Sequence, residues 1–404
     1  MVAFGPPGRV AGLMPRKILH LDLDAFFCAV EAQRNPDLEG KAFAVGGSPD
    51  RRGVVSSCSY PARAFGVHSA MPMSQALRIC PHLIVVPHGG GYGQVSQKVM
   101  ARLRELTPLV QQISVDEAFL DVSDLPDPLS DMARTLQARI QQELGLPCSL
   151  GGATNKLIAK IANTVGKSQA RASDYPRAIT IVPAGQEAAF LAPLPVRELW
   201  GVGPKTAERL HTLGIHTIGE LAAMSQKELM RHFGQHGYDL ARRARGIDKR
   251  PVEPNRGAAK SISNETTFAH DVQDGRILRN TLRRLTANVA KSLRRKGYAG
   301  RTVRLKLRLS DFTTLSRQST LPQATDDERI ITQAVLELFD ALWQSGQPVR
   351  LLGAGVSNLQ KGWVQLKLWE EKEDRLRKLQ STLDTLQEKY GETIIHRGVD
   401  ERER

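Results

Sequence analysis

The stretch from Ile113 to Ser123 constrains the fold most, because it sets two adjacent carboxylates inside a run of strand-forming residues. The apolar side chains on either side of the pair Asp116–Glu117 are Ile113, Val115, Ala118, Leu120 and Val122. Their alternation changes parity across the pair, so one straight strand cannot place all of them on one face. The pattern therefore predicts a tight turn or bulge at Asp116–Glu117, which pushes both carboxylates out at the rim of a sheet.

Two carboxylates held side by side in apolar surroundings need a counter-charge, which a divalent cation supplies. For an acidic pair on its own, a solvated hairpin turn is the simpler interpretation. A second acidic pair favours the metal site. Leucines alternate with polar residues over 19–24, so the leucines face a core while Asp22 and Asp24 share the opposite face. Residues 25–30 are apolar and are therefore expected to be buried, which places Asp22 at the mouth of a buried region. If Asp22 meets Asp116 and Glu117 there, the three carboxylates form a site for two Mg²⁺ ions.

Four motifs occur in an order typical of one protein family. They are DLDAFFCAVE (22–31), YPAR (60–63), SVDEA (114–118) and NKLIAK (155–160). Together they resemble the Y-family translesion DNA polymerases, most closely the bacterial DNA polymerase IV type. The resemblance extends from about Met14 to the end of the chain.

The resemblance implies an α/β multidomain fold, that of a right-hand polymerase with palm, small fingers, a helical helix-hairpin-helix thumb and a βαββαβ little-finger domain. The expected parts are a disordered lead (1–14), the palm (15–29 and 93–183), the fingers (30–92), the thumb (184–249), a linker (250–257), the little finger (258–361), and a clamp-binding motif with a helical tail (362–404). Met14 is an alternative start of translation.

Hydrophobic patterns predict the elements of the palm. Residues 17–24 have the pattern of a strand, and residues 25–34 that of a buried helix that ends at Asn35-Pro36. The other predicted elements are helices over 92–106, 132–144 and 155–165 and a strand over 149–152. Asp24 is either a further metal ligand or the N-cap of the helix at 25–34, and we favour the cap.

Residues 199–221 carry a helix-hairpin-helix signature. Gly201 and Gly203 permit a tight turn, and Pro204 then begins a helix. Backbone N–H groups at this hairpin, beside Lys205, are suited to hold a DNA phosphate without reading the base sequence. The alternative is an ordinary turn between two helices.

After the linker, the pattern predicts strand, helix, strand, strand, helix and strand over 259–268, 274–296, 301–310, 313–321, 326–344 and 350–358. This order suits a four-stranded sheet with both helices on one face. In the second strand Arg304, Lys306 and Arg308 face away from the helices. Twelve Lys or Arg and no acidic residue lie between Asp274 and Asp311. A solvated face is the alternative, but like charges without counter-ions repel unless a polyanion compensates them, and the resemblance implies duplex DNA.

The composition agrees with a nucleic-acid partner. The chain has 404 residues and a formal net charge of +14, which favours a polyanion, nucleic acid before membrane. No apolar run approaches membrane-spanning length, and residues 1–12 lack the apolar core of a signal peptide. The four cysteines show no C-x-x-C spacing, which predicts neither a zinc site nor disulfides and fits a reducing bacterial cytoplasm. We expect a monomer without membrane contact.

The resemblance assigns the catalytic and metal-binding residues. Asp22, Asp116 and Glu117 match the ligands of two Mg²⁺ ions, with the Leu23 carbonyl contributing, and Mn²⁺ is an expected substitute. One ion lowers the pKa of the primer 3′-hydroxyl and the other neutralises the triphosphate. Primer-template DNA and dNTPs are the expected substrates.

The resemblance also assigns nucleotide binding to Phe26, Phe27, Ser57, Tyr60, Arg63 and Lys167. Tyr60 and Arg63 lie three residues apart at the start of a predicted helix, so both side chains can point toward phosphate. Lys167 stands at a triphosphate-binding lysine, but the turn after it departs from the family pattern. The residues that could share its role are Lys156, Lys160 and Arg171.

Phe27 matches the steric-gate residue, whose ring occupies the space that a ribose 2′-hydroxyl needs. The alternative is that Phe27, like Phe26, is a core residue. One of these two aromatic rings is expected to pack inward and the other to face the site.

Residues 365–369 (QLKLW) resemble the peptide with which bacterial polymerases bind the sliding clamp. The expected clamp-binding residues are Gln365, Leu366, Leu368 and Trp369, with Trp369 in place of the usual phenylalanine. Leu368 and Trp369 are apolar anchors for a hydrophobic groove, and Gln365 can hydrogen-bond at its edge. The alternative is one more strand or the start of the following helix.

These features predict a template-directed DNA polymerase of the low-fidelity translesion type, which extends a primer 3′ end and bypasses damaged template. Two other classes remain open. A nucleotidyl cyclase also uses acidic residues and two metals on a palm-like fold, but it needs neither a helix-hairpin-helix nor a basic sheet. A non-catalytic relative that acts as a DNA-repair scaffold is expected to lose acids of the triad, and here all three are present.

Overall fold

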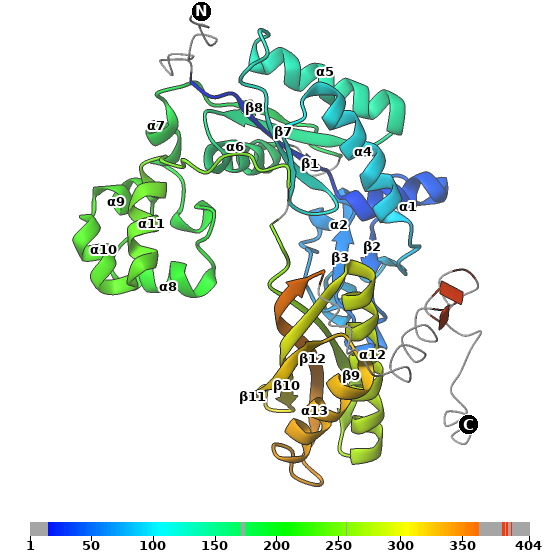
Figure 1. The fold of residues 1–404 in the computed structure, drawn as a ribbon. Helices are drawn as coiled ribbons and strands as arrows, with labels where there is room; N and C mark the ends of the chain where they lie inside the picture. The colour runs from blue at the N-terminus through cyan, green and yellow to red at the C-terminus, as the bar shows by residue number, and fades with distance from the viewer. Residues whose placement is uncertain are drawn as a thin grey trace, which may run out of the picture. The chain divides into compact units, whose positions relative to one another are not determined.

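A computed structural model describes residues 15–170, 174–255 and 257–362, together with 382–383, 385–386 and 389. The chain divides into two compact units, Met1–Arg256 and Gly257–Arg404 (Figure 1). The predicted lead at 1–14, Arg171 and the clamp motif at 365–369 lie outside the described residues. No helix in the described part of the chain has the length and apolar character needed to cross a bilayer.

The first unit is built on a five-stranded sheet with the strand order β5-β6-β1-β7-β8. These strands are β1 (Ile18–Leu23), β5 (Val110–Gln112), β6 (Glu117–Asp121), β7 (Cys148–Ala153) and β8 (Ile179–Ile181). The central strand β1 pairs antiparallel with both β6 and β7. The helices around the sheet are α4 (Tyr92–Leu106), α5 (Leu129–Leu144) and α6 (Lys156–Gln169).

Both faces of this sheet are buried. Leu19, Leu21 and Leu23 share one core with side chains of α4 and α5, whereas Ile18 and Phe119 share another with α6. The prediction that the leucines of β1 lie opposite Asp22 and Asp24 is confirmed, and both aspartates contact Lys167 of α6. Helix and sheet lie unusually close there, because a Cβ at Gly151 of β7 would be 1.9 Å from the carbonyl oxygen of Ala159.

The predicted break before β6 is confirmed, but its predicted position is wrong. The turn spans residues 113–116, and Glu117 is already the first residue of β6. Ile113 and Val115 are therefore exposed turn residues (37% and 39%) and not strand residues. The Ser114 hydroxyl closes the turn by accepting the N–H groups that follow it, a preference of serine that the apolar alternation does not reveal.

The region expected to form the fingers lies between β1 and α4. Its elements are α1 (Phe26–Arg34), β2 (Phe43–Gly46), β3 (Val55–Cys58), α2 (Tyr60–Ala64), α3 (Met73–Ile79) and β4 (Ile84–Val86), with short 3₁₀ helices η1 (Pro36–Leu38) and η2 (Pro49–Arg51). The strands form a separate sheet with the order β3-β2-β4. The prediction that Asp24 caps α1 is wrong, since the N-cap is Ala25, at φ 45° and without a side-chain hydrogen bond, while Asp24 is fully buried and bonded elsewhere.

The region expected to form the thumb is helical. It contains α7 (Glu187–Leu191), η3 (Val196–Glu198), α8 (Pro204–Thr212), α9 (Ile218–Ala223), α10 (Gln226–Phe233) and α11 (Gln235–Ala244). Capping boxes begin α9 and α10, each with a hydroxyl N-cap and a glutamate three residues later. The predicted helix-hairpin-helix is confirmed: Pro204 begins α8, and Gly201 before it has φ +102°, a conformation that favours glycine.

The second unit has the predicted βαββαβ order. Its elements are β9 (Ser261–Val272), α12 (Gly275–Lys296), β10 (Tyr298–Leu309), β11 (Thr314–Thr325), α13 (Glu328–Asp340) and β12 (Val349–Lys361). The strands form one sheet with the order β11-β10-β12-β9, and α12 and α13 pack on one face of it (Figure 1). In β10, Val303, Leu305 and Leu307 are buried, as predicted.

The assumption that the basic segment between Asp274 and Asp311 lacks counter-ions is wrong. Its charges do have counter-ions, which come from outside residues 274–311: Lys306 pairs with Glu265 at 2.7 Å, and Arg279 pairs with Asp340. Lys306 and Glu265 lie on strands separated by β12, and the residue between them in the register is Gly353. Because Gly353 has no side chain, the two charged groups can meet across it.

Candidate active site

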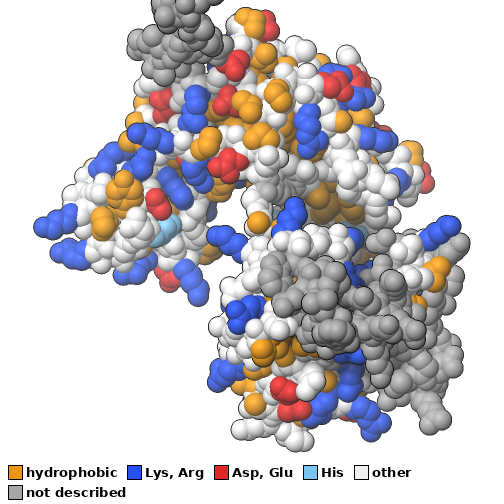
Figure 2. All heavy atoms as spheres, viewed as in Figure 1, with side chains coloured by type: hydrophobic (Ala, Val, Ile, Leu, Met, Phe, Trp, Pro, Cys, Tyr) orange, Lys and Arg blue, Asp and Glu red, His pale blue; other side chains and the backbone are white. Residues whose placement is uncertain are grey.

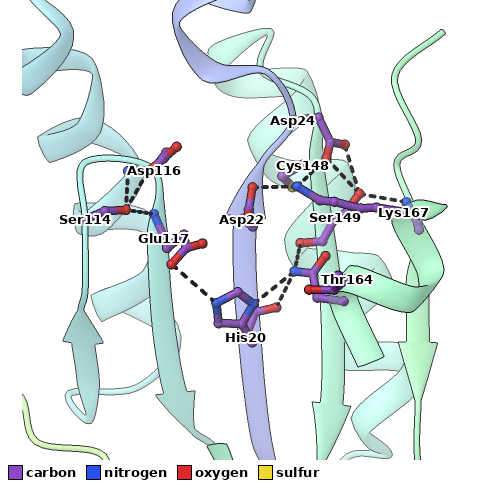
Figure 3. Close-up of polar contacts among 12 residues, drawn as sticks. His20, Asp22, Asp24, Ser114, Asp116, Glu117, Cys148, Ser149, Thr164 and Lys167 are labelled. Carbon is purple, nitrogen blue, oxygen red and sulfur yellow. Dashed lines mark hydrogen bonds and ion pairs between the residues drawn. The ribbon is translucent and has the colours of Figure 1, made fainter. Parts of the chain in front are cut away.

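Three carboxylates meet at the end of β1. Asp22 is the register partner of Glu117 across the β1–β6 pair, and the Leu23 N–H donates to the carbonyl oxygen of Asp116 at 3.0 Å. Asp116 itself is held by Ser114, whose hydroxyl contacts its carboxylate and accepts its N–H at 3.2 Å (Figure 3). The structure thus brings together the acids that the sequence singled out, from segments more than ninety residues apart.

Helix α6 supplies the positive charges that face these acids. The Lys160 ammonium lies 2.8 Å from both oxygens of Glu117. The Lys167 ammonium bridges Asp22 at 2.5 Å and Asp24 at 2.8 Å. The spacing of these lysines, with Asn163 between them, places one polar stripe of α6 along the acidic face of the sheet.

The Asp24 carboxylate holds the start of β7 and the segment that precedes β8. Its buried carboxylate accepts hydrogen bonds from the Ser149 hydroxyl at 2.9 Å and from the backbone N–H of Arg177 at 3.1 Å. Ser149 in turn accepts the N–H of Ala178 at 3.0 Å. A buried carboxylate requires such partners, and Lys167 completes the set. Asp24 is thus a structural partner of Lys167 and not a helix cap.

Burial and mutual repulsion act on the protonation of the site. Burial raises the pKa of Asp22 to about 6 against the pull of Lys167, and the charges of Glu117 and Asp116 add to the rise. Burial also acts to raise the pKa of Glu117, but contacts with His20 and Lys160 outweigh it and hold that pKa well below its usual range. Burial would lower the pKa of Lys167, yet Asp22 and Asp24 hold it above its usual range.

The donor set fits a divalent cation by its chemistry. Carboxylate oxygens are the ligands that Mg²⁺ prefers, and the repulsion among these acids is relieved by a cation between them. In the structure Lys160 and Lys167 provide that charge. Among the described residues, no group of three or more His, Cys, Asp or Glu side chains has the geometry to hold a metal ion as it stands.

Residues predicted to bind the nucleotide surround the same site. Tyr60 begins α2 and is buried, and the Arg63 guanidinium lies 4.8 Å from the centre of its ring, so both side chains point the same way, as predicted. Burial raises the pKa of Tyr60 to about 12, and the charges of Asp24 and Lys167 also act on it, which places the phenol beside them. Ser57 in β3 is buried as well.

Phe26 and Phe27 differ in burial. Phe26 is a core residue with 2% of its surface exposed. Phe27 is only partly buried, and its ring centre lies 4.5 Å from that of Tyr92 and 5.9 Å from that of His88. Phe26 therefore packs inward, as expected for one of the two rings, and the role of Phe27 at the site stays a prediction.

The predicted DNA-binding residues lie on two other surfaces. Gly203 is the N-cap of α8 without a side-chain cap, and Lys205 in the first turn is exposed. Figure 2 shows Lys and Arg side chains over much of the visible face of the thumb helices. In the second unit, Arg304 and Lys306 line a groove of about 160 Å³ on the sheet face opposite the helices, and Arg308 follows on the same strand.

Sequence reasoning missed His20, Asn163, Ser149 and Tyr175. Tyr175 packs on Tyr60 with ring centres 5.5 Å apart, and nothing in its local sequence indicates this. Asn163 could have been found, because Lys160, Asn163 and Lys167 follow helical spacing on one face.

Comparison with known proteins identifies the family of this chain. The model of the impB/mucB/samB family matches residues 21–164, that of its C-terminal domain residues 259–368, and that of its HHH motif residues 185–215. A DNA polymerase IV of Dehalococcoides mccartyi (strain CBDB1) is 40% identical over 388 residues, which cover 95% of this chain and 97% of the relative. A DNA polymerase IV of Listeria innocua serovar 6a is 41% identical over 349 residues, 85% of this chain and 95% of the relative.

A solved Y-family DNA polymerase chimera has the same fold. Its TM-score is 0.73 at 23% identity, and the match covers 85% of this chain and 98% of the chimera. The predicted right-hand fold, with palm, fingers, thumb and little finger, is therefore confirmed. Together the family models, the extent of the sequence identity and the fold show that the chain belongs to the Y-family DNA polymerases, of the bacterial DNA polymerase IV type.

Proposed function

We propose that this chain is a template-directed DNA polymerase that adds dNTPs to a primer 3′ end by two-metal phosphoryl transfer and continues past damaged template bases. The observation that supports this best is the meeting of Asp22, Asp116 and Glu117 at adjacent strand ends. Relatives named DNA polymerase IV match nearly the whole chain, and a polymerase of this family requires divalent metal, primer-template and dNTPs.

In this proposal the acids hold two Mg²⁺ ions, or Mn²⁺ in their place, with the Leu23 carbonyl as a further ligand. When bound, the ions would neutralise the triphosphate and lower the pKa of the primer 3′-hydroxyl. Ser114 keeps the Asp116 carboxylate at the rim of the sheet. Until cations bind, Lys160 and Lys167 supply the positive charge that faces Glu117 and Asp22.

The nucleotide is held from the fingers side. Arg63 is exposed, lies over the Tyr60 ring and donates from Nε to the Cys58 carbonyl oxygen at 3.3 Å. The other N–H groups of its guanidinium can bind the β- and γ-phosphates, while the Tyr60 hydroxyl adds a hydrogen bond. Lys167 adds a point charge, Ser57 lies on the strand before Tyr60, and Phe26 packs beneath Phe27. The Phe27 ring excludes a ribose 2′-hydroxyl by volume.

DNA is held by backbone phosphates. The uncapped N-terminus of α8, with Gly201, Gly203 and Lys205, offers N–H groups and a positive end to one phosphate. We assign 184–249 to the thumb, 30–92 to the fingers, and 15–29 with 93–183 to the palm. Residues 258–361 form the little finger, whose Arg304, Lys306 and Arg308 contact the duplex.

Two other functions fit less well. A nucleotidyl cyclase would have no use for the helix-hairpin-helix or for the open basic sheet. A repair scaffold without catalysis would have no need of Ser114, Lys160 and Lys167 arranged around the triad.

Primer extension tests the proposal. We expect purified protein to extend a primer on intact template and past a single damaged base, with dNTPs and not rNTPs, and only with Mg²⁺ or Mn²⁺. A matched reaction with Asp22→Asn protein separates intrinsic activity from a contaminating polymerase. DNA binding without extension under all these conditions would instead favour the scaffold.

The clamp remains a proposed partner through Gln365, Leu366, Leu368 and Trp369. A clamp raises the effective concentration of a weakly processive monomer at the primer end. We expect Leu368→Ala/Trp369→Ala protein to lose clamp capture and clamp-stimulated synthesis while clamp-independent extension is unchanged. Retention of both clamp effects would make the motif structural.

A further inference from the structure

Behind the acidic site lies a histidine that no role assigned so far uses. His20 is on β1, two residues before Asp22, and is 1% exposed. Its register partner is Phe119, so Glu117 is its diagonal neighbour on the adjacent strand. Its Nε2 lies 3.9 Å from Glu117 Oε2 and has no hydrogen-bond partner among the described residues (Figure 3).

The position of the proton on the His20 ring follows from the surroundings of its other nitrogen, Nδ1. The Asn163 amide nitrogen lies 3.2 Å from the His20 carbonyl oxygen, 3.0 Å from the Ser149 carbonyl oxygen and 3.1 Å from His20 Nδ1. Two carbonyl oxygens can only accept, so the side of Asn163 that faces them must be its NH₂ group. An NH₂ group beside Nδ1 leaves no room for a proton there.

An imidazole ring carries a proton on at least one of its two nitrogens, so a ring without a proton on Nδ1 carries it on Nε2. That N–H is buried, has no hydrogen-bond acceptor in the described part of the chain, and lies beside the Glu117 carboxylate. A separation of 3.9 Å is longer than a hydrogen bond, so the contact becomes one when the carboxylate moves less than about 1 Å toward the ring.

We propose that His20 is a positioning residue for Glu117, and that Asn163 fixes the tautomer that lets it act. Lys160 holds both carboxylate oxygens of Glu117 from the other side. If a divalent cation displaced Lys160, Nε2–H of His20 would donate to one oxygen of Glu117 and leave the other available to the metal. The inference rests on the proposed function, which makes Glu117 a ligand.

Two amide substitutions separate the two ring nitrogens. In His20→Gln, the side-chain NH₂ can take the place of Nε2–H. In His20→Asn, the amide reaches only the place of Nδ1 and leaves Glu117 without a donor. Loss of such an outer partner typically weakens metal binding about 10- to 100-fold.

The measurement is Mn²⁺ binding to the protein–DNA complex without nucleotide, followed by the electron paramagnetic resonance of free Mn²⁺. We expect His20→Asn to raise the dissociation constant about 10- to 100-fold, and His20→Gln to stay within about threefold of wild type. Ile18→Val on the same strand is the control for a disturbed core, and thermal unfolding confirms that all variants are folded.

The proposal fails if His20→Asn binds Mn²⁺ like wild type, or if His20→Gln loses as much affinity as His20→Asn. It also fails if Ile18→Val shows the same loss, since general destabilisation would then explain it. Failure of the proposed function looks different: Glu117→Ala would leave Mn²⁺ affinity unchanged.

Discussion

The two large sheets of this protein differ in how far their polar residues are buried. The palm sheet is covered on both faces, and its acids Asp22 and Glu117 are partly buried and paired with Lys167 and Lys160 of α6. The little-finger sheet is covered on one face only, and Arg304, Lys306 and Arg308 lie on the other.

This difference corresponds to two kinds of task. In the palm, burial strengthens each electrostatic contact and makes every partner necessary, so single residues carry large effects. On the little finger, the proposed contacts would bind a polyanion by releasing counterions, and their contributions would add. The contrast predicts abrupt losses from palm substitutions and graded losses from the little finger.

The largest effect is expected at the triad. Asp116→Ala or Glu117→Ala removes a metal ligand, which is worth several kcal/mol at the transition state, so incorporation should fall at least about 10³-fold. DNA affinity should stay near wild type, because no positive charge is lost. Single-turnover extension and a binding titration measure the two quantities, and near-normal extension by either variant would contradict the two-metal assignment.

The second effect concerns sugar choice. Phe27→Ala should open space beside C2′ and raise the rNTP to dNTP ratio of kcat/KM by roughly 10- to 200-fold, the range for steric pocket changes. Phe65→Ala, at an exposed phenylalanine elsewhere in the fingers region, is the control. An unchanged ratio for Phe27→Ala would mean that the ring is only part of the core.

A smaller effect should follow from Asp24. Asp24→Asn keeps the shape but removes the buried charge that holds Lys167, and losing a charged hydrogen bond should raise the KM for dNTP about tenfold with less change in kcat. Asp174→Asn, an exposed acid paired with Arg177, is the matched control. Equal KM values for the two variants would show that Asp24 does not position Lys167.

The smallest and most graded effect belongs to the little finger. Changing Arg304, Lys306 and Arg308 together to alanine should reduce the slope of log K against log salt by up to about 0.9 per lost phosphate contact. The control removes the same charge from the helix face, with Arg283, Arg284 and Arg295 changed to alanine. If both triple variants change the slope equally, net charge and not this face explains the binding.

Sequence patterns predicted best where one face of an element is buried. The alternation of β10 and the order βαββαβ are confirmed, since apolar periodicity reports burial directly. The turn before Glu117 and the cap of α1 were misplaced, because Ser114 and Asp24 bond to distant or backbone groups that periodicity does not encode. His20 was missed for the same reason: its partners Asn163 and Glu117 are brought to it only by the packing of α6 and the pairing of β6.

Gly151 has a consequence for how this site can change in evolution. The helix α6 rests almost directly on the backbone of β7 at this glycine, and any larger residue would force the two apart. Helix α6 carries Lys160, Asn163 and Lys167. A displacement of the helix therefore moves the polar groups of all three residues away from the sheet together. A methyl group at position 151 would therefore weaken the contacts of all three side chains at once, although it would clash only with the backbone of Ala159 and Asn163.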